Sequence, residues 1–333
     1  MVANGKNEFR IGFDLGGTKM LALLFDKKFK VIARRRRKTK PEEGQESGLT
    51  RIVETIQQLL NEAGIGKKDL AAMGIAVPGP LDLDKGILLE APNLGWKNVP
   101  LKKRLEAEFE CQAVVSNDVD AGVYGEYLFG AGNKARCVLG VFPGTGIGGG
   151  CVYSGRILRG KTRSCVEIGH LQVVPNGQLC GCGLHGCLET VASRLAISSA
   201  AISAAARGEA PHLLETYGTD IADVRSGALA DAIKAGDKAV EIIVKDAAAW
   251  LGIGVASGVS ILAPDVVVLG GGLVEAMPTL IREEVERSAR SHTMNTMRNS
   301  FRVVVAVLGD DATAVGAAAW AAKRAPAGKK DSK

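Results

Sequence analysis

The stretch Phe9–Phe25, FRIGFDLGGTKMLALLF, decides the fold. Residues alternate in polarity from Phe9 to Asp14, and Met20 to Phe25 forms a second apolar run, so the sequence predicts two strands. Between them, Leu15-Gly16-Gly17-Thr18-Lys19 supplies the glycines that a tight turn requires. We therefore expect a β-hairpin with a glycine-rich tip.

A similar pattern occurs again in the middle of the chain. Arg136 to Phe142 reads as a strand, Gly144–Gly150 (GTGIGGG) as a glycine turn, and Cys151 to Tyr153 as the start of a returning strand. The two stretches form a weak internal repeat, which predicts two similar halves facing each other. The remaining segments alternate between strand and helix, so we expect an α/β architecture with sheets covered on both faces.

The periodicity of apolar residues places the other elements. The expected strands are Lys30–Arg37, Ala71–Val77, Ala113–Ser116, Val266–Leu269 and Arg302–Val307. The expected helices are Gly48–Ala63, Pro100–Phe109, one beginning near Ala121, Thr190–Arg207, Ala228–Ala235, Asp237–Val259, Met277–Arg290 and Ala312–Lys323.

Length and composition narrow the class of protein. The chain has 333 residues, which at about 150 residues per domain suggests two domains. Apolar residues make up 46% and charged residues 23%, which excludes a disordered or collagen-like chain. Glycine is over-represented: 42 of the 333 residues, about 13%, are glycine, against a typical content of about 7%. Clustered glycines let a backbone approach a ligand closely, so we expect a ligand-binding protein.

The formal net charge of +6 raises the question of a nucleic-acid partner. The positive charge gathers in the run Arg34–Arg37, extended by Lys38 and Lys40, and in the C-terminal tail. No aromatic residues interleave with these charges as single-strand binders require, so we expect a solvated strand end and a disordered tail at 325–333 rather than a nucleic-acid site.

Two further features bear on location. Met1–Glu8 is short and polar and does not resemble a signal peptide, so we expect a cytoplasmic protein. Ala247–Pro264 is an uncharged stretch of 18 residues, but it contains several glycines and serines and leads directly into a strand. It is better explained as a buried helix of small residues than as a membrane span.

Three glycine turns are candidates for binding a nucleotide, because converging backbone N–H groups bind phosphate. The first, Asp14–Lys19, adds a carboxylate that could hold Mg²⁺ through water, the Thr18 hydroxyl and the Lys19 ammonium. The second is Gly144-Thr145-Gly146. The third, Gly270-Gly271-Gly272, follows a buried strand and suits a base or ribose. Neither a Walker A sequence nor a dinucleotide fingerprint matches, and purely structural turns are the alternative.

Asp118 is the candidate general base for phosphoryl transfer to an alcohol, which needs a carboxylate to accept the hydroxyl proton. It follows a short apolar strand, whose end should project into a crevice, and Asn117 beside it can donate to and accept from a polyol. Asp120 could compete for this role. The structural alternative for Asp118 is the N-cap of the following helix.

A metal site is the most specific local signal. His170, Cys180, Cys182 and Cys187 form the pattern His-x9-Cys-x-Cys-x4-Cys, with glycines that let the chain wrap around an ion. One imidazole and three thiolates predict a closed, structural Zn²⁺ site, and in a reducing cytoplasm a metal explains the cluster better than a disulfide. The other thiols, Cys111, Cys137, Cys151 and Cys165, are expected to be ordinary buried residues.

Polar residues next to this pattern suggest a polyol site. A zinc-bound imidazole keeps a proton on its second nitrogen, which a sugar hydroxyl could accept. Glu167 and Glu189 flank the pattern, so the ordered loop would hold their carboxylates towards neighbouring hydroxyls. Exposed glutamates beside a structural metal are the alternative.

Taken together, these motifs resemble the ROK family of repressors and sugar kinases, specifically its bacterial glucokinase branch. The resemblance covers most of the chain. The residues that carry it are Asp14–Lys19, Ala91–Trp96, Ser116–Asp118, Gly144–Gly150, Glu167–His170, the three cysteines with Glu189, and Val267–Gly272.

The resemblance implies an actin/hexokinase-like, ribonuclease H-like duplicated fold with an active-site cleft between two domains. The domains would be 1–122, with a helix at about 311–324 packing back on it, and 123–310. It also implies Mg²⁺-dependent transfer of the γ-phosphoryl group of ATP to a hexose 6-hydroxyl, and usually a homodimer. By position, Asp118 would be the base and Asn93, Asn117, Glu167, His170 and Glu189 would contact the sugar. The first two glycine turns would hold the phosphates, and the third the adenosine.

One departure from the family pattern concerns specificity. The family usually has small residues, often Ala-Gly, before its Glu-x-Gly-His, whereas Ser164-Cys165-Val166 stand here. We expect the segment Lys161–Val166 to line the approach to the site. Glucose is the first expectation, followed by N-acetylglucosamine or N-acetylmannosamine, then fructose or allose, because single substituents separate these sugars.

Other functions fit less well. A sugar-responsive repressor of the family carries a helix-turn-helix before this region, and the eight residues before Phe9 leave no room for one. A catalytically inactive sensor would lack the base, which is present as Asp118. ATP is the expected donor, with polyphosphate as the alternative because of the Arg34–Arg37 run.

Overall fold

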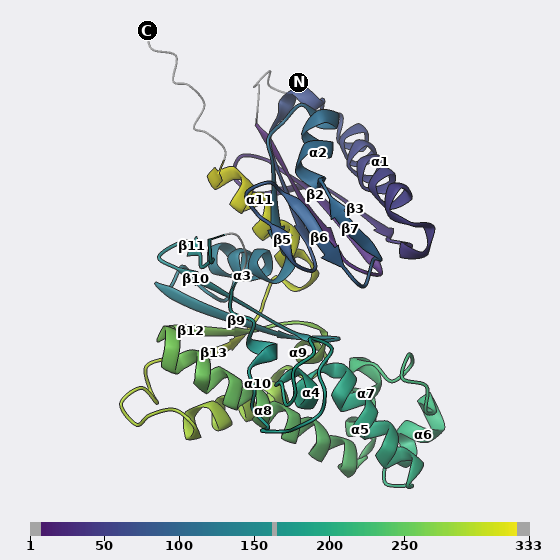
Figure 1. Ribbon diagram of the computed structural model, residues 1–333, viewed down its shortest axis with the longest axis vertical. Coiled ribbons are helices and arrows are strands. Elements are labelled where there is room, and N and C mark those ends of the chain that lie inside the picture. The colour runs from purple at the N-terminus through teal and green to yellow at the C-terminus, as the bar shows by residue number, and fades with distance from the viewer. Residues whose placement is uncertain (1–7, 162–164, 325–333) are drawn as a thin grey trace. The chain divides into compact units, whose positions relative to one another are not determined.

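The computed structural model describes residues 8–161 and 165–324, which form two compact α/β units (Figure 1). The first unit comprises Met1–Phe129, Ile157–Cys165 and Asp310–Lys333, and the second comprises Gly130–Arg156 and Val166–Gly309. Three stretches lie outside the described residues: the tail at 325–333, residues 1–7, and residues 162–164 of the segment expected at Lys161–Val166. The boundary expected at residue 122 falls within a helix, Asp118–Phe129, that belongs wholly to the first unit.

The first unit is built on a five-stranded mixed sheet with the order β3-β2-β1-β4-β8. The predicted hairpin is present: β1 pairs antiparallel with β2, and β1, β4 and β8 run parallel. The strands are β1 (Phe9–Leu15), β2 (Lys19–Phe25), β3 (Val31–Lys38), β4 (Leu70–Val77) and β8 (Ala113–Asn117). Since the carboxyl ends of parallel strands meet at one edge, the ends of β1 and β8 lie at the same edge of this sheet.

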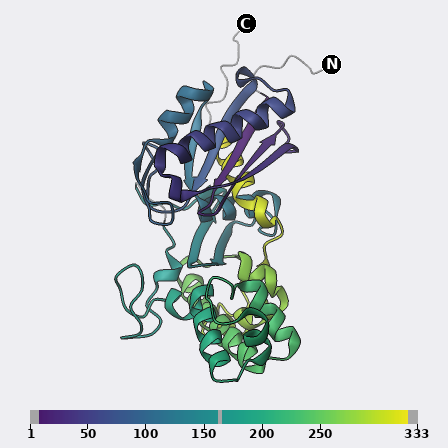
Figure 2. The same ribbon diagram turned by 90° about the vertical axis from the view of Figure 1, so that its right-hand side faces the viewer.

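Helices cover both faces of this sheet. They are α1 (Gln45–Ala63), α2 (Leu101–Phe109), α3 (Asp118–Phe129) and α11 (Ala312–Arg324), with short turns η1 (Pro41–Glu43), η2 (Lys67–Asp69) and η4 (Gly309–Asp311). Figure 2 shows α1 in front of the strands and the yellow α11 behind them. A Cβ at Gly12 would lie 1.9 Å from the Ala314 carbonyl oxygen, and one at Gly74 would lie 1.9 Å from that of Ala317. Glycine in the strands and alanine in α11 therefore let helix and sheet approach closely.

The second unit repeats the plan with a sheet of order β11-β10-β9-β12-β13. Here β9 pairs antiparallel with β10 and parallel with β12, as β1 does with β2 and β4. The strands are β9 (Cys137–Pro143), β10 (Ile147–Tyr153), β11 (Arg156–Ile157), β12 (Val266–Leu269) and β13 (Arg302–Val305). The predicted internal repeat is thus confirmed as a duplicated sheet topology.

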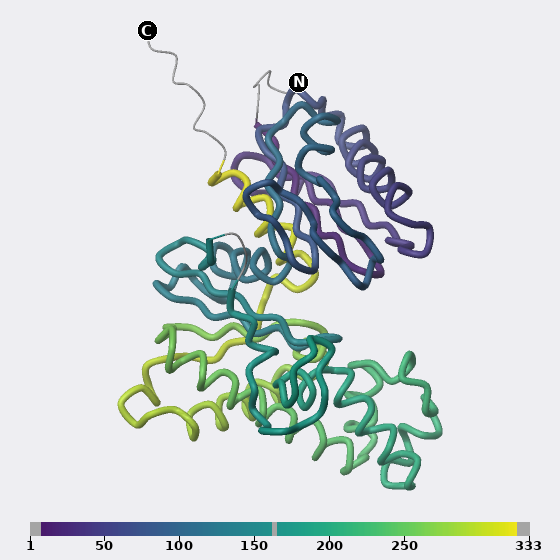
Figure 3. The backbone as a smooth tube through the Cα atoms, in the orientation of Figure 1, coloured from purple at the N-terminus to yellow at the C-terminus, as the bar shows by residue number. Residues whose placement is uncertain are grey.

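Most helices of the second unit pack against one long helix, α8. The helices are α4 (Glu189–Ala192), α5 (Arg194–Ala206), α6 (Pro211–Tyr217), α7 (Ser226–Ala235), α8 (Lys238–Leu262), α9 (Gly272–Ala276) and α10 (Pro278–Ser291), with the turn η3 (Ile168–His170). Figure 3 traces α8 beside α10, against which it packs. By length and composition α8 could span a membrane, but 56% of its most apolar window is buried inside the unit, as in a core helix.

The structure corrects several sequence expectations. Gly148–Gly150 belong to strand β10 rather than to the turn, because they pair with β9. Glycine is required at position 149, where a Cβ would lie 2.4 Å from the Val166 carbonyl oxygen. The segment Thr190–Arg207 is two helices, broken at Ser193, whose side chain caps α5. Helix α6 and a three-stranded sheet were not predicted; the strands of that sheet are β5 (Leu81–Asp82), β6 (Ile87–Ala91) and β7 (Trp96–Val99).

Candidate active site and metal centre

The first glycine turn closes the β1–β2 hairpin tightly. The Gly16 N–H donates to the Lys19 carbonyl at 3.0 Å, and a Cβ at Gly16 would come within 2.8 Å of that oxygen, so the turn requires glycine. Thr39, the residue that follows β3, secures the turn, since its hydroxyl donates to the Gly16 carbonyl at 2.7 Å. Asn93 lies beside Gly17, at 3.5 Å from the position of a Cβ there, while Thr18 and Lys19 are exposed.

Two carboxylates approach each other at the sheet edge where β1 and β8 end. Burial, and after it the charge of Asp118, raise the pKa of Asp14 to about 7, although the charge of Lys19 acts in the opposite direction. Asp14 and Asp118 therefore share one region, although they are 104 positions apart in the sequence. The sequence prediction named both groups separately; the parallel order β1-β4-β8 brings them together.

The end of β8 shows which groups cap helix α3. The helix begins at Asp118 rather than near Ala121. The Asn117 side-chain oxygen accepts hydrogen bonds from the N–H groups of Val119 at 2.9 Å and Asp120 at 3.1 Å, which is the role of an N-cap. Asp118 accepts one from Val119 at 2.9 Å and stays half-buried, whereas Asp120 is only 1% exposed. Asp118 is therefore the more accessible of the two aspartates.

Asp310 is a further charged group at this site, and sequence reasoning missed it. The Lys19 Nζ donates to both Asp310 carboxylate oxygens, at 2.8 and 2.9 Å, and Arg36 donates to one of them at 2.9 Å. The hydrogen bond from Lys19 lowers the pKa of Asp310. The only sequence signal was the acidic pair Asp310-Asp311 just before the final helix.

The basic run on β3 is neutralised on both sides. Arg34 and Arg36 pair with Asp311 and Asp310, while the alternate residues Arg35 and Arg37 pair with glutamates of α1, Glu62 and Glu54. Successive side chains of a strand point to opposite faces of the sheet, so alternate arginines pair with acidic residues of two different segments. Each guanidinium of the run therefore has an acidic partner within its own unit.

The second and third glycine turns lie next to each other in the second unit. The Gly144 N–H donates to the Gly146 carbonyl at 2.8 Å, and a Cβ at Gly271 would lie 2.8 Å from the carbonyl of Pro143. Gly271 has φ 86, in the left-handed region that favours glycine, and Gly272 begins α9. The predicted turns 144–146 and 270–272 are therefore brought together at the ends of β9 and β12.

The four predicted metal ligands also converge in this unit. The ligand atoms of His170, Cys180, Cys182 and Cys187 all lie within 4.8 Å of one another. The His170 Nδ1 is 3.6 Å from the Cys180 Sγ, and the sulfurs of Cys182 and Cys187 are 3.7 Å apart. Thiolates bound tetrahedrally to one zinc at about 2.3 Å lie about 3.8 Å apart, so these spacings fit such an ion.

The four ligands lie on residues 170–187, the metal loop, whose shape depends on two glycines. Gly183 and Gly186 have φ 89 and 75, and a Cβ at Gly186 would lie 1.7 Å from the Val174 carbonyl oxygen. The other cysteines of the described chain stand apart from the cluster: Cys137 and Cys151 are buried, as expected, whereas Cys111 and Cys165 are only partly buried.

Glu189 links the metal loop to the second glycine turn. Its carboxylate accepts a hydrogen bond from the Ile147 N–H at 2.9 Å and one from the Cys180 Sγ at 3.7 Å. A Cβ at Gly146 would lie 2.2 Å from the same carboxylate. Glu167 directly precedes η3, where its carbonyl accepts the N–H of His170 at 3.0 Å. The loop that could hold a metal is thus tied to the turn that could hold a phosphate.

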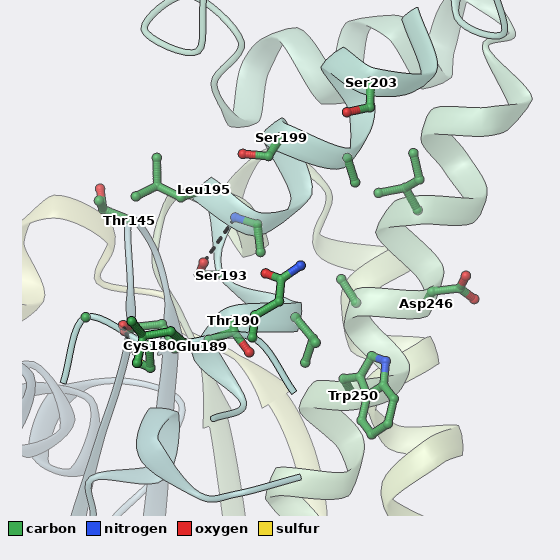
Figure 4. A pocket seen from close by; sticks show the side chains of 18 residues that line it. Thr145, Cys180, Glu189, Thr190, Ser193, Leu195, Ser199, Ser203, Asp246 and Trp250 are labelled. Carbon is green, nitrogen blue, oxygen red and sulfur yellow. Dashed lines mark hydrogen bonds between the residues drawn. The ribbon is translucent and has the colours of Figure 1, made fainter. Parts of the chain in front are cut away.

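The metal loop also borders a cavity of about 700 Å³ within the second unit. Figure 4 shows Cys180, Glu189 and Thr145 near one end, Ser199 and Ser203 on α5, and Asp246 and Trp250 on α8. A space of this size is in the range of small-molecule sites.

Comparisons with known proteins agree with this geometry. The model of the ROK family matches residues 10–324. A glucokinase of Halalkalibacterium halodurans is 31% identical over 94% of this chain and 94% of its own. A crystal structure of a ROK family glucokinase from Streptomyces griseus, in complex with glucose and AMPPNP, has a TM-score of 0.82 and 32% identity, over 95% of this chain and 99% of that one.

The family also contains regulators. A xylose repressor of Caldicellulosiruptor bescii is 27% identical over 92% of this chain but 76% of its own length. The fold and the likeness to solved sugar kinases define an actin/hexokinase-like α/β protein. The chain belongs to the ROK family.

Proposed function

We propose that this ROK-family sugar kinase is an ATP-dependent glucokinase that phosphorylates the 6-hydroxyl of glucose. The observation that carries the proposal is its likeness, over nearly the full length of both chains, to a glucokinase structure in complex with glucose and AMPPNP. The glycine turns and carboxylates of each unit supply the groups that phosphoryl transfer needs.

Asp118 acts as the general base in this proposal. It accepts the proton of the 6-hydroxyl as that oxygen bonds to the γ-phosphorus, and the bond from the γ-phosphorus to the bridging oxygen breaks, leaving ADP and the sugar phosphate. Its half-buried place at the end of β8 supports the role. Asn93 and Asn117, close to this edge in the first unit, are proposed sugar contacts.

The phosphate groups of ATP are proposed to contact the turns at Gly16-Gly17-Thr18-Lys19 and Gly144-Thr145-Gly146, and the adenosine the turn at 270–272. Asp14 would hold Mg²⁺, which would neutralise charge developing on the phosphates. Burial, and after it the charge of Asp118, raise the pKa of Asp14, so a bound cation would favour the charged form of this carboxylate.

We propose a structural Zn²⁺ in the cluster of His170 and the three cysteines, on the fit of the ligand spacings. The ion would hold Glu189, Glu167 and His170 in place for the sugar hydroxyls without taking part in the transfer. Glu189 fits this role because it contacts both Cys180 and the second glycine turn.

The sugar itself is the finer part of the proposal. Val166 precedes Glu167 with φ 67, a left-handed conformation that a β-branched residue adopts only under strain and that glycine adopts freely. Val166, where the family has a small residue, therefore places a strained backbone directly before Glu167. N-acetylhexosamines, fructose and allose are the alternatives that this segment could favour.

The deciding experiment is a coupled ADP-release assay with Mg·ATP against glucose, fructose, mannose, allose, N-acetylglucosamine and N-acetylmannosamine. Polyphosphate replaces ATP in a second series, with the sugar phosphate detected directly. A dominant kcat/KM for glucose with ATP supports the proposal. A higher kcat/KM for another sugar would make that sugar the substrate of the same proposed mechanism. Efficient use of polyphosphate overturns the proposal of ATP as the donor.

A sugar sensor is the second candidate, favoured by the likeness to the xylose repressor. It would bind sugar without turnover, so absence of product with every sugar, together with measurable glucose binding, supports it. We also propose that the kinase works in the cytoplasm as a homodimer. Light scattering of the purified chain tests the dimer.

A further inference from the structure

Arg194 stands at the second glycine turn with its guanidinium beside Thr145. It is the first residue of α5, and its N–H donates to the Gly144 carbonyl at 2.9 Å. Its Nη2 donates to the Thr145 hydroxyl at 3.3 Å. The backbone of Arg194 thus holds the turn at Gly144, while its side chain contacts Thr145 of the same turn.

Arg225 brings a second positive charge to the same place. It directly precedes α7, and its Nε donates to the Ala222 carbonyl at 2.8 Å. Partial burial, and after it the charge of Arg225, lower the pKa of Arg194. The charge of Arg225 therefore acts on Arg194 in the direction of like-charge repulsion.

Neither guanidinium forms an ion pair with an acidic side chain in the described part of the chain. Four other arginines of the same unit do form such pairs, with glutamates: Arg207, Arg282, Arg287 and Arg290. A cation in the first turn of a helix is also disfavoured by the helix macrodipole, which applies to Arg194 at the start of α5. Two like charges placed without an acid partner are a cost that an incoming anion would offset.

The third glycine turn completes the surroundings. A Cβ at Gly272 would lie 3.8 Å from the Ser226 hydroxyl, so the start of α7, with Arg225, adjoins the turn 270–272. Arg194 adjoins the turn 144–146. The two arginines consequently flank the pair of turns to which the nucleotide is assigned in the proposed function.

We infer that Arg194 and Arg225 bind the phosphate chain of a nucleoside di- or triphosphate from the side of the second unit. Guanidinium groups suit phosphate because their planar donors match its oxygens in pairs. The Thr145 hydroxyl adds a further donor. This inference rests on the proposed function, and it makes the two arginines determinants of donor affinity in addition to the glycine turns.

Calorimetric titration of the full chain with Mg·ADP, and with adenosine by competition, tests the inference. Arg194→Gln and Arg225→Gln should each weaken Mg·ADP binding about tenfold or more, because each removes a charge-assisted contact, and should leave adenosine binding unchanged. Arg207→Gln is the matched control: it removes an arginine at the other end of α5 whose partner is Glu209, and should bind Mg·ADP as the wild type does.

Arg194→Lys separates charge from fold, since it keeps a cation at the same helix position. It should bind Mg·ADP more tightly than Arg194→Gln and less tightly than the wild type. Unchanged Mg·ADP affinity in both glutamine variants, or an equal loss of adenosine and Mg·ADP binding, overturns the inference. If the wild type binds polyphosphate but no Mg·ADP, the proposed donor is wrong, which is a different result from a failure of the two arginines.

Discussion

Lys19 donates two hydrogen bonds to the carboxylate of Asp310, which lies 291 residues further along the chain. Arg36 donates to the same carboxylate from β3. The ammonium at the tip of the first hairpin is thereby held by the turn that precedes α11. Lys19, which we propose contacts the phosphates of ATP, is thus oriented by an acidic residue distant in sequence, and both side chains of the pair are about half exposed.

Because the ion pair of Lys19 with Asp310 is half exposed, we expect loss of Lys19 to affect ATP binding more than the stability of the fold. Lys19→Met should raise the KM for Mg·ATP about tenfold, because one charge-assisted contact with a phosphate is lost. It should lower the free energy of unfolding by no more than about 1 kcal/mol, since exposed ion pairs contribute little. Steady-state kinetics and urea unfolding measure the two effects. Arg37→Gln, which breaks a pair with Glu54 on α1, should leave KM unchanged.

Asp118 should be essential for turnover and dispensable for sugar binding. Asp118→Asn removes the proton acceptor while preserving size, so kcat should fall by about 10²–10⁴-fold, the usual contribution of a general base. Glucose affinity, measured by calorimetry, should change much less. Asp84→Asn, at an exposed aspartate of the same unit, serves as the control. Near-normal kcat in Asp118→Asn would remove Asp118 from the role.

Asp14 should make the stability of the protein without added Mg²⁺ depend on pH. Its folded pKa of about 7 lies above the ordinary value of 3.8, so the folded state holds a proton that the unfolded state has released. Its favourable contribution is therefore present at low pH and lost as pH rises towards and through 7. Asp14→Asn, which never ionises, should gain thermal stability relative to the wild type between pH 5 and pH 8.

Asp118 also supplies an internal check on this pH effect, because its charge raises the pKa of Asp14. In Asp118→Asn the pKa of Asp14 should be lower, and carbon NMR of the carboxyl group would detect the change. An equal stability difference between wild type and Asp14→Asn at both pH values would contradict the raised pKa.

Local patterns were enough to predict the two glycine hairpins, because alternation and a glycine tip occupy one continuous stretch. The same logic fails for the small sheet of β5, β6 and β7. Leu81–Asp82 is too short to alternate, and Ile87–Ala91 and Trp96–Val99 have no strict period. Only their pairing with one another defines them as strands, and pairing depends on the tertiary structure.

The candidate site divides in the same way. The metal ligands fall within 18 residues of sequence, from His170 to Cys187, so their spacing alone predicted the cluster. Asp310 and Lys19 meet only because α11 returns to the first sheet. Arg194 and Arg225 belong to no recognisable motif. Their proposed role in phosphate binding rests on the absence of acidic partners among their described neighbours, which a sequence does not reveal.

Loss of a cysteine ligand should remove the metal and weaken the sugar site together. Cys187→Ser should abolish the zinc content found by mass spectrometry, lower the thermal midpoint and raise the KM for glucose, because the loop would no longer hold Glu189. His185→Gln is the matched control, since His185 lies in the same loop but its Nδ1 is 3.0 Å from the Gly177 carbonyl and outside the cluster. It should keep its zinc. A wild type without zinc, or a Cys187→Ser variant with an unchanged KM for glucose, would contradict the proposed link between the metal loop and the sugar.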